Sequence, residues 1–319
     1  MPLLFLCSTE FVQAGAIPAP EKAAITIVDT TPAFWSFWEA AQGKSEEERV
    51  RLFMESVVNT HPELYAEDVI NSVALTGAGA NKDPGKIVAN YLREVIPFIP
   101  RMKSISDTIQ HDFELFAADF TLTFPRYAPA APVYFMVSIF SFDGGTRNIG
   151  GKSALLFGID GIARFHPQDD NLKVFFDHEL FHLYHDQIAP ELTDDDAPLW
   201  MSMWEEGLAT YVSQKMNDGS TEAQALMSPT LARQTKAVLP KAAKELLVNM
   251  DSLDKKEYAA FFYGTNGRAD LPPRCGYYVG YLVAQRLGAK RSLQQMADLR
   301  GGELKEAVRR ALEQLAAQP

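Results

Sequence analysis

The sequence predicts an α+β fold in which a small, mostly antiparallel sheet lies beside a central helix and is flanked by N- and C-terminal helices. Pro132 to Phe142 and Ser153 to Phe165 are rich in β-branched and aromatic residues, as strands are, and the glycine-rich turns between them predict a hairpin. Apolar residues recur at helical spacing in Leu172 to Gln187 and in Trp200 to Ser213. These features together predict a sheet followed by two helices.

Both ends of the chain are expected to be helical. Helical spacing is seen in Ala33 to Val58 and in Asn81 to Phe120, the latter broken by two prolines, and again from about Ser228 onward. We therefore divide the chain into a signal remnant, a helical N-terminal region, a core and a helical C-terminal region packed on the core, with the bounds 1–16, 17–120, 121–215 and 216–319.

The first sixteen residues are similar to the end of a secretory signal. Met1 to Ala16 begins with an apolar run and ends in small residues that fit a cleavage site, although the usual basic start is missing. This predicts a periplasmic or secreted protein, and a cytoplasmic protein with a disordered N-terminus stays open. No other stretch reaches the roughly 18 apolar residues of a spanning helix, so no transmembrane segment is expected in the mature chain.

The composition excludes some classes of partner. The 319 residues carry a formal net charge of -11 at pH 7. Nucleic acids and anionic membranes attract clustered lysine and arginine, so neither is expected as a partner. The two cysteines, Cys7 and Cys275, cannot form a disulfide framework. The oligomeric state stays open.

Residues His178 to His182 read His-Glu-Leu-Phe-His, which is the HExxH pattern. Two histidines four apart on a helix point the same way and can share one metal ion. Glu179 lies on the same side of the helix, and phenylalanine, leucine and tyrosine side chains occupy the other side. Zinc lowers the pKa of a water molecule to about 7, so a carboxylate beside the first ligand can take its proton. We therefore assign His178 and His182 as ligands of one zinc ion and Glu179 as the catalytic base.

A catalytic zinc of this kind needs a third protein ligand. His185 shares the ligand face but lies seven residues from His178, a rise of about 10.5 Å, whereas zinc–nitrogen bonds are about 2.0–2.1 Å long. His185 is therefore excluded. The remaining candidates are Glu205 and Glu206 on the following helix. Helical spacing alone would bury Glu205 and does not favour Glu206.

The segment Glu206-Gly207-Leu208-Ala209 decides this choice by resemblance. An HExxH pattern followed some two dozen residues later by such a segment resembles the gluzincin metallopeptidases, and the resemblance implies that Glu206 is the ligand glutamate. The later segment Arg274 to Tyr281 is similar to bacterial predicted zinc-dependent proteases related to gliding-motility lipoproteins. The resemblance covers about Val133 to Leu287 and implies a zincin-like fold.

One departure limits what the resemblance implies. Twenty-three residues separate His182 from Glu206, more than in the aminopeptidase-type gluzincins. Exopeptidase specificity is therefore not carried over, and endo- versus exo-action stays open.

Four further residues and one strand are candidates for supporting roles. Amide hydrolysis needs a donor for the developing oxyanion, which Tyr277 or Tyr278 could supply, with packing in the core as the alternative. Asp186 could orient a ligand histidine, or it could be a solvated helix end. His166 could face the site. In gluzincin-like proteases the peptide lies along an edge strand of the sheet, and we nominate Ser153 to Phe165 as that strand.

The sequence thus predicts a zinc-dependent metallopeptidase with one zinc per chain that hydrolyses peptide or protein substrates. Two alternatives stay open. The same site could hydrolyse small non-peptide amides or esters, because function depends on the pocket and not on the fold. The protein could also be a non-catalytic, zinc-stabilised envelope protein. The presence of Glu179 favours the hydrolases, since a structural zinc site has no use for a base.

Overall fold

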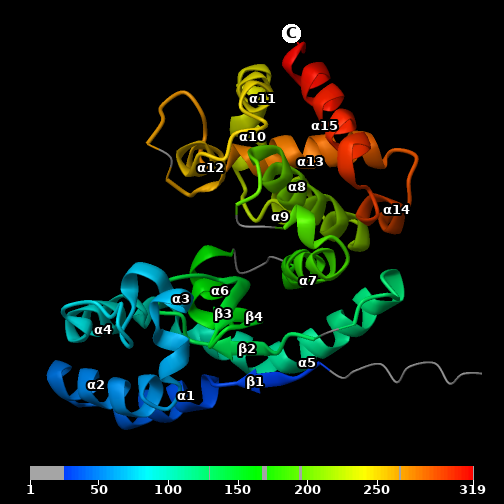
Figure 1. Ribbon diagram of the computed structural model, residues 1–319. Coiled ribbons are helices and arrows are strands. Elements are labelled where there is room, and N and C mark those ends of the chain that lie inside the picture. The colour runs from blue at the N-terminus through cyan, green and yellow to red at the C-terminus, as the bar shows by residue number, and fades with distance from the viewer. Residues whose placement is uncertain (1–24, 129, 167–170, 194–195, 266, 319) are drawn as a thin grey trace, which may run out of the picture.

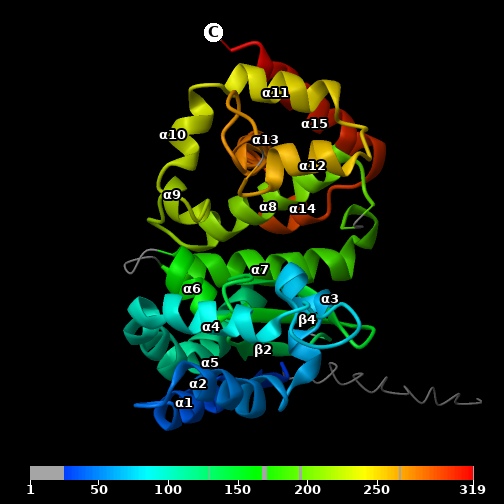
Figure 2. The same cartoon turned by 90° about the vertical axis from the view of Figure 1, so that its left-hand side faces the viewer.

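Helix α7 (Leu172–Ile188) lies at the middle of the molecule, between two stacked halves (Figure 1, Figure 2). One half holds the N-terminal helices and the sheet, and the other holds the helices from α8 (Leu199–Met216) to the C-terminus. The α+β class and the flanking helices are therefore confirmed. This computed structural model describes residues 25–128, 130–166, 171–193, 196–265 and 267–318, so the expected signal remnant lies outside the described residues.

The sheet is mixed, with its four strands in the order β1–β2–β4–β3. In chain order they are β1 (Ile27–Asp29), β2 (Val133–Met136), β3 (Gly144–Ile149) and β4 (Lys152–Gly158). The first two strands and β4 run parallel, and only β3 runs antiparallel, to β4. The expected mostly antiparallel sheet is therefore wrong, and the hairpin joins β3 to β4 instead of β2 to β4. Residues 154–157 of β4 are a continuous buried apolar run, as is usual in a parallel strand covered on both faces.

The stretch Ser153 to Phe165 is not one strand, as the sequence suggested, but β4 followed by helix α6 (Ile159–Phe165). Helix α6 begins at Ile159, and its second residue, Asp160, has a buried carboxylate that accepts hydrogen bonds from the backbone N–H groups of Ser138 and Phe140, both at 2.7 Å. These bonds tie α6 to the loop after β2. Because β4 is an interior strand, it cannot offer the edge nominated for a peptide. The edge strand that contacts α7 is β3.

The N-terminal region is helical and covers the sheet. Its segments are α1 (Thr31–Ala40), α2 (Glu46–Phe53), the π-helix η1 (Met54–Val58), η2 (Pro62–Tyr65), α3 (Glu67–Ile70), η3 (Asn71–Val73), α4 (Pro84–Glu94), η4 (Ile96–Phe98) and α5 (Ile99–Thr123). The long helix α5 packs through Phe113, whose ring lies 5.7–5.8 Å from the rings of Phe135 on β2, Phe157 on β4 and Phe176 on α7. This aromatic cluster fixes α7 above the sheet.

The C-terminal half is a bundle of helices around α8 and α13. The short helix η5 (Pro190–Leu192) lies between α7 and α8. The helices that follow α8 are α9 (Glu222–Ala225), α10 (Leu231–Lys236), α11 (Leu239–Val248), α12 (Lys255–Phe262), α13 (Cys275–Gly288), α14 (Leu293–Ala297) and α15 (Gly301–Ala316). No described helix is long and apolar enough to span a membrane. The division into regions at residues 16, 120 and 215 stays a prediction.

Helices α8 and α13 cross at their closest point through two glycines. A Cβ atom on Gly207 would lie 2.1 Å from the carbonyl carbon of Gly280, and one on Gly280 would lie 2.2 Å from the carbonyl oxygen of Met203. No side chain fits between the two backbones. This crossing positions α8, the helix that carries Glu206, against the start of α13.

Substituting Gly207→Ala should destabilise the protein by about 1–3 kcal/mol, because the added methyl group must push two helix backbones apart. Urea unfolding followed by circular dichroism measures the change. Gly302→Ala is the matched control, because a Cβ at Gly302 has no neighbour within 4 Å, and its stability should be unchanged or slightly higher. Equal stability of both variants would show that the helices do not cross as closely as described.

Candidate metal centre

Helix α7 brings His178 and His182 together, as the HExxH spacing predicts. The side chain of Asn171 caps its first turn by accepting a hydrogen bond from the backbone N–H of Lys173 at 3.1 Å. One side of the helix is buried against the aromatic cluster, and His178 is only 2% exposed. The Nε2 atoms of the two histidines lie 3.0 Å apart. Both rings therefore present the same nitrogen to one point.

Glu206 completes a group of three ligand atoms. Its Oε2 lies 3.4 Å from Nε2 of His178 and 3.4 Å from Nε2 of His182. The three ligand atoms all lie within 4.8 Å of one another. The choice of Glu206 over Glu205, which spacing could not make, therefore agrees with this geometry.

The donor set fits zinc. Two imidazole nitrogens and one carboxylate oxygen are a usual protein set for a catalytic zinc, with one position left for water or substrate. The Nε2 atoms of the two histidines and the Oε2 atom of Glu206 are turned toward one point, as the ligands of a single cation must be. The Nδ1 atom of His178 is buried and has no hydrogen-bond partner among the described residues, so polar contact for this ring depends on its Nε2 side.

The charges of these residues are strongly coupled. Burial alone would raise the pKa of Glu206, but the two histidines outweigh burial and hold that pKa well below its usual range. Burial would likewise lower the pKa of His182, but the carboxylates of Glu206 and Glu205 outweigh it and raise that pKa well above the usual value. Burial lowers the pKa of His178. Without a metal, the proton of this group therefore sits on His182.

Glu205 has a separate place in the site. Its Oε1 lies 3.2 Å from Nδ1 of His182, which donates the hydrogen bond when Nε2 faces a metal. Asp186, the residue suggested for such a role, is exposed and accepts a hydrogen bond from the Thr193 hydroxyl at 2.8 Å. Asp186 is thus the solvated helix end, and Glu205 is the orienting carboxylate. In the sequence, only the helical spacing, which predicts that Glu205 is buried, indicated that Glu205 belongs to the site.

Glu179 is mostly enclosed and lies among other charged groups. Burial raises the pKa of its carboxyl to about 7, with Asp143 acting in the same direction and His182 and Arg147 opposing it. Asp143 in turn lies 2.9 Å from Nε2 of His166. The ring of His166 packs on Phe175 and is buried, and the polar contact of its side chain is with Asp143 and not with a metal ligand.

The two candidate tyrosines, Tyr277 and Tyr278, have different surroundings. Burial and, to a smaller extent, the charges of Glu206 and Glu179 raise the pKa of Tyr277. Tyr278 lies elsewhere, since the ammonium of Lys236 is 5.6 Å from its ring and its ring stacks on Tyr281. A catalytic role of either tyrosine stays a prediction.

His185 takes no part in the group, as expected. It is fully buried, its ring stacks on Phe181, and neither ring nitrogen has a hydrogen-bond partner among the described residues. Burial lowers the pKa of His185 to about 3. The ring is therefore neutral and packs as an apolar side chain.

Glu205→Gln should weaken zinc binding by about 10–100-fold, because an amide orients His182 less firmly and makes it a weaker base than a carboxylate does. Competition with a chelator of known zinc affinity measures this. Asp186→Asn, which changes an exposed carboxylate on the neighbouring turn, is the control and should bind zinc as the wild type does. Equal affinity of all three proteins would remove Glu205 from the site.

Zinc affinity should rise with pH by about tenfold per unit around neutrality. The raised pKa of His182 means that the metal-free protein holds a proton there, and zinc must displace that proton because only neutral imidazole binds metal. The gain should level off once the pH exceeds this raised pKa. Isothermal titration in buffers of different ionisation enthalpy counts the released protons, and release of none at pH 7 would contradict the assigned charge state.

One comparison with known proteins bears on this site. Residues 153–304, just under half of the chain, match the family model described as "Predicted Zn-dependent protease (DUF2268)". The searches of the curated proteins and of the solved structures gave no match. The matched segment runs from β4 into α15 and contains His178, His182 and Glu206. The part of the chain that carries the candidate metal ligands is therefore similar to a family of predicted zinc-dependent proteases.

Proposed function

We propose that the protein is a metallopeptidase that binds one zinc ion through His178, His182 and Glu206 and uses Glu179 as its base. The observation that carries this proposal is the convergence of three ligand atoms from two helices beside a carboxylate of raised pKa. The match to predicted zinc-dependent proteases supports it. We also propose that the protein acts in the periplasm or outside the cell, on the basis of residues 1–16 alone.

The residues around the metal ligands have defined tasks in this proposal. When bound, zinc supplies Lewis-acid polarisation of a carbonyl and lowers the pKa of water to about 7. Glu179, with a pKa near the same value, accepts the proton of the attacking water and passes it to the leaving amine. Tyr277 keeps its proton because its pKa is raised, so its hydroxyl can donate a hydrogen bond to the developing oxyanion.

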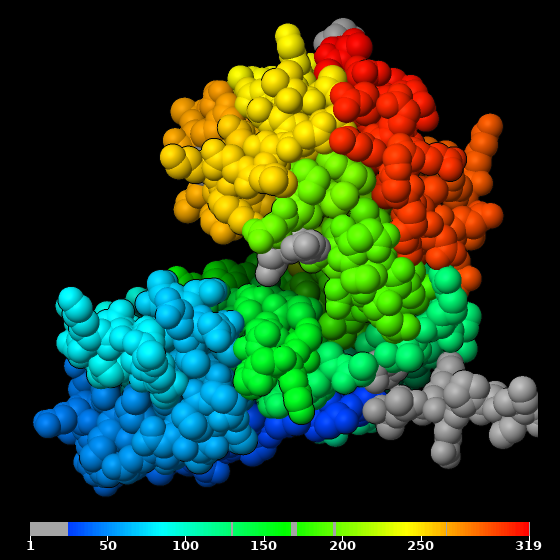
Figure 3. Space-filling view, in the orientation of Figure 1, coloured from blue at the N-terminus to red at the C-terminus, as the bar shows by residue number. Residues whose placement is uncertain are grey.

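The edge strand β3 favours a peptide over a small amide or ester. It ends the sheet on the side next to α7, and an extended peptide can pair with the free backbone groups of such a strand. The molecular surface is hollowed between the two halves, where α12 faces the N-terminal helices (Figure 3). A chain lying on β3 would therefore run beneath the metal ligands of α7 and α8. A non-catalytic zinc site gives no reason for a base such as Glu179.

The substitution Glu179→Gln should abolish peptide hydrolysis, by at least about 100-fold in kcat, while zinc stays bound. The amide keeps the shape of the side chain but cannot accept the proton. Glu206→Gln should instead lose zinc, because it removes an anionic ligand. Zinc content by elemental analysis and cleavage of a peptide pool followed by mass spectrometry distinguish the two. Full activity of Glu179→Gln would reject the mechanism, and full zinc in both variants would reject the ligand assignment.

A further inference from the structure

Arg274 has a backbone conformation that its side chain does not favour. It is the residue before α13 and its φ is 61°, in the left-handed region that suits glycine. Non-glycine residues persist there only when the surrounding structure forces them, and such residues cluster at functional sites. Glycine at this position would relieve the backbone strain. It would not disturb the packing of α13, because Arg274 precedes that helix.

The positive charge of Arg274 is also electrostatically unfavourable for two reasons. It lies at the N-terminus of α13, the positive end of the helix dipole. It also lies at the start of the helix that crosses α8 close to the metal ligands, because Gly280 of α13 meets Gly207, the residue after Glu206. A cation at this place weakens the binding of another cation by the same residues. The site therefore carries a group that hinders its own metal.

No carboxylate among the described residues forms an ion pair with Arg274. Its guanidinium lies over the ring of Tyr277, 4.6 Å from the ring centroid, and this cation–π contact is modest in strength. The contact holds the guanidinium next to Tyr277, which lies three residues before Gly280, where α13 crosses α8. Arg274 is thus a half-buried, oriented cation at the edge of the metal site.

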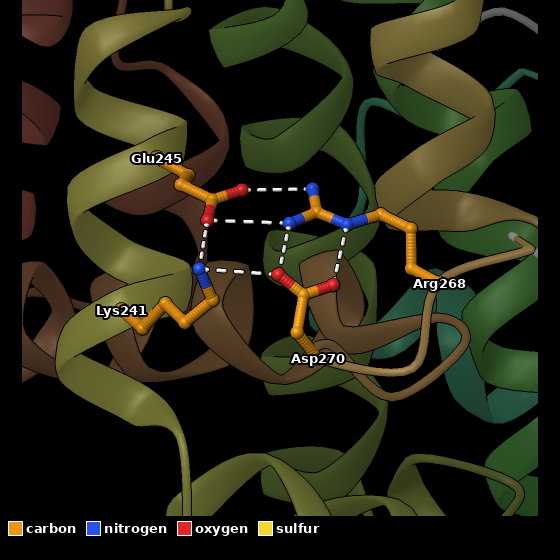
Figure 4. Close-up of polar contacts among 4 residues, drawn as sticks. All are labelled: Lys241, Glu245, Arg268 and Asp270. Carbon is orange, nitrogen blue, oxygen red and sulfur yellow. Dashed lines mark hydrogen bonds and ion pairs between the residues drawn. The ribbon is translucent and has the colours of Figure 1, made fainter.

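Arg268, six residues earlier, shows the opposite arrangement (Figure 4). Its guanidinium is bonded to Glu245 at 2.8 and 3.2 Å and to Asp270 at 2.8 and 3.0 Å, and Lys241 joins the same two carboxylates. This network ties the segment before α13 to α11. The carboxylates of Glu245 and Asp270 are therefore paired with Arg268 and Lys241, while the guanidinium of Arg274 lies over the ring of Tyr277.

We propose that Arg274 binds a carboxylate of the substrate next to the scissile bond. This rests on the proposed peptidase function and names its substrate class. A guanidinium forms two parallel hydrogen bonds with a carboxylate, and the resulting pair offsets both the repulsion of zinc and the unfavourable helix end. A protein with a net charge of -11 otherwise repels anionic peptides, so a local cation is needed to hold one. The carboxylate belongs either to an acidic side chain or to the C-terminus of the peptide.

Binding to the zinc-loaded Glu179→Gln protein tests this without the need for turnover. The probes are peptides of one sequence with Glu or Gln at each of the central positions, each made with a free and with an amidated C-terminus. We expect at least about tenfold tighter binding of the peptide that carries the carboxylate. A Glu effect at one position identifies an acidic side chain, and an effect of amidation identifies the C-terminal carboxylate.

Adding Arg274→Gln should remove this preference, and Arg274→Glu should replace it by a preference for Lys at the same position. Arg233→Gln changes the charge equally at an exposed position of α10 and should leave the preference intact. No preference in the starting protein, or the same preference after Arg274→Gln, would overturn the proposal. Failure of the wild type to cleave any peptide would instead overturn the proposed function and leave the binding comparison valid.

Arg274→Gly gives a second readout that is independent of peptides. Because glycine suits a φ of 61°, the variant should melt at a higher temperature than the wild type and bind zinc at least as tightly. Higher stability with lost carboxylate preference is the expected pair of results. A lower melting temperature would mean that Arg274 serves the fold, and the proposal would then be wrong.

Discussion

The contact between α7 and α8 is the interaction on which the rest of the molecule depends. It places Glu206 at 3.4 Å from two imidazole nitrogens that are themselves 3.0 Å apart. Burying such groups is costly unless they are paired or bind a metal. The apolar contacts around them supply the support: the aromatic cluster holds α7 from below, and the glycine crossing with α13 holds α8 from above. Closely packed helices therefore hold a buried charged group in which Glu206 pairs with a protonated His182 when no metal is bound.

The site was easier to predict from the sequence than the fold. His178 and His182 follow from local spacing on one helix, and no tertiary information is needed to place them on one face. Glu206 required the resemblance, because helical spacing favoured Glu205. The structure explains this conflict: both residues face α7, Glu206 toward the Nε2 atoms and Glu205 toward Nδ1 of His182. Spacing gives the face of a helix but not which atom a side chain reaches.

The sheet could not be predicted, for physical reasons. An apolar run such as residues 154–157 is compatible with a parallel or an antiparallel partner, and β1 joins β2 across more than a hundred residues. The chain changes from strand β4 to helix α6 where Asp160 accepts hydrogen bonds from backbone N–H groups of the loop after β2. The residues around Asp160 in the sequence do not indicate this contact. Tyr277 and Tyr278 are neighbours in a largely apolar helix, and only packing decides that Tyr278 lies beside Lys236 and Tyr281. Long-range contacts decided each of these features.

The central claim is that His178, His182 and Glu206 hold one zinc ion, and zinc content is its most direct test. Elemental analysis of the purified protein after exposure to zinc and removal of the excess should give about one zinc per chain, and the folded His178→Ala variant treated in the same way should retain almost none. Circular dichroism of the variant verifies that it is folded. A wild type without zinc, or a variant with full zinc content, would contradict the account.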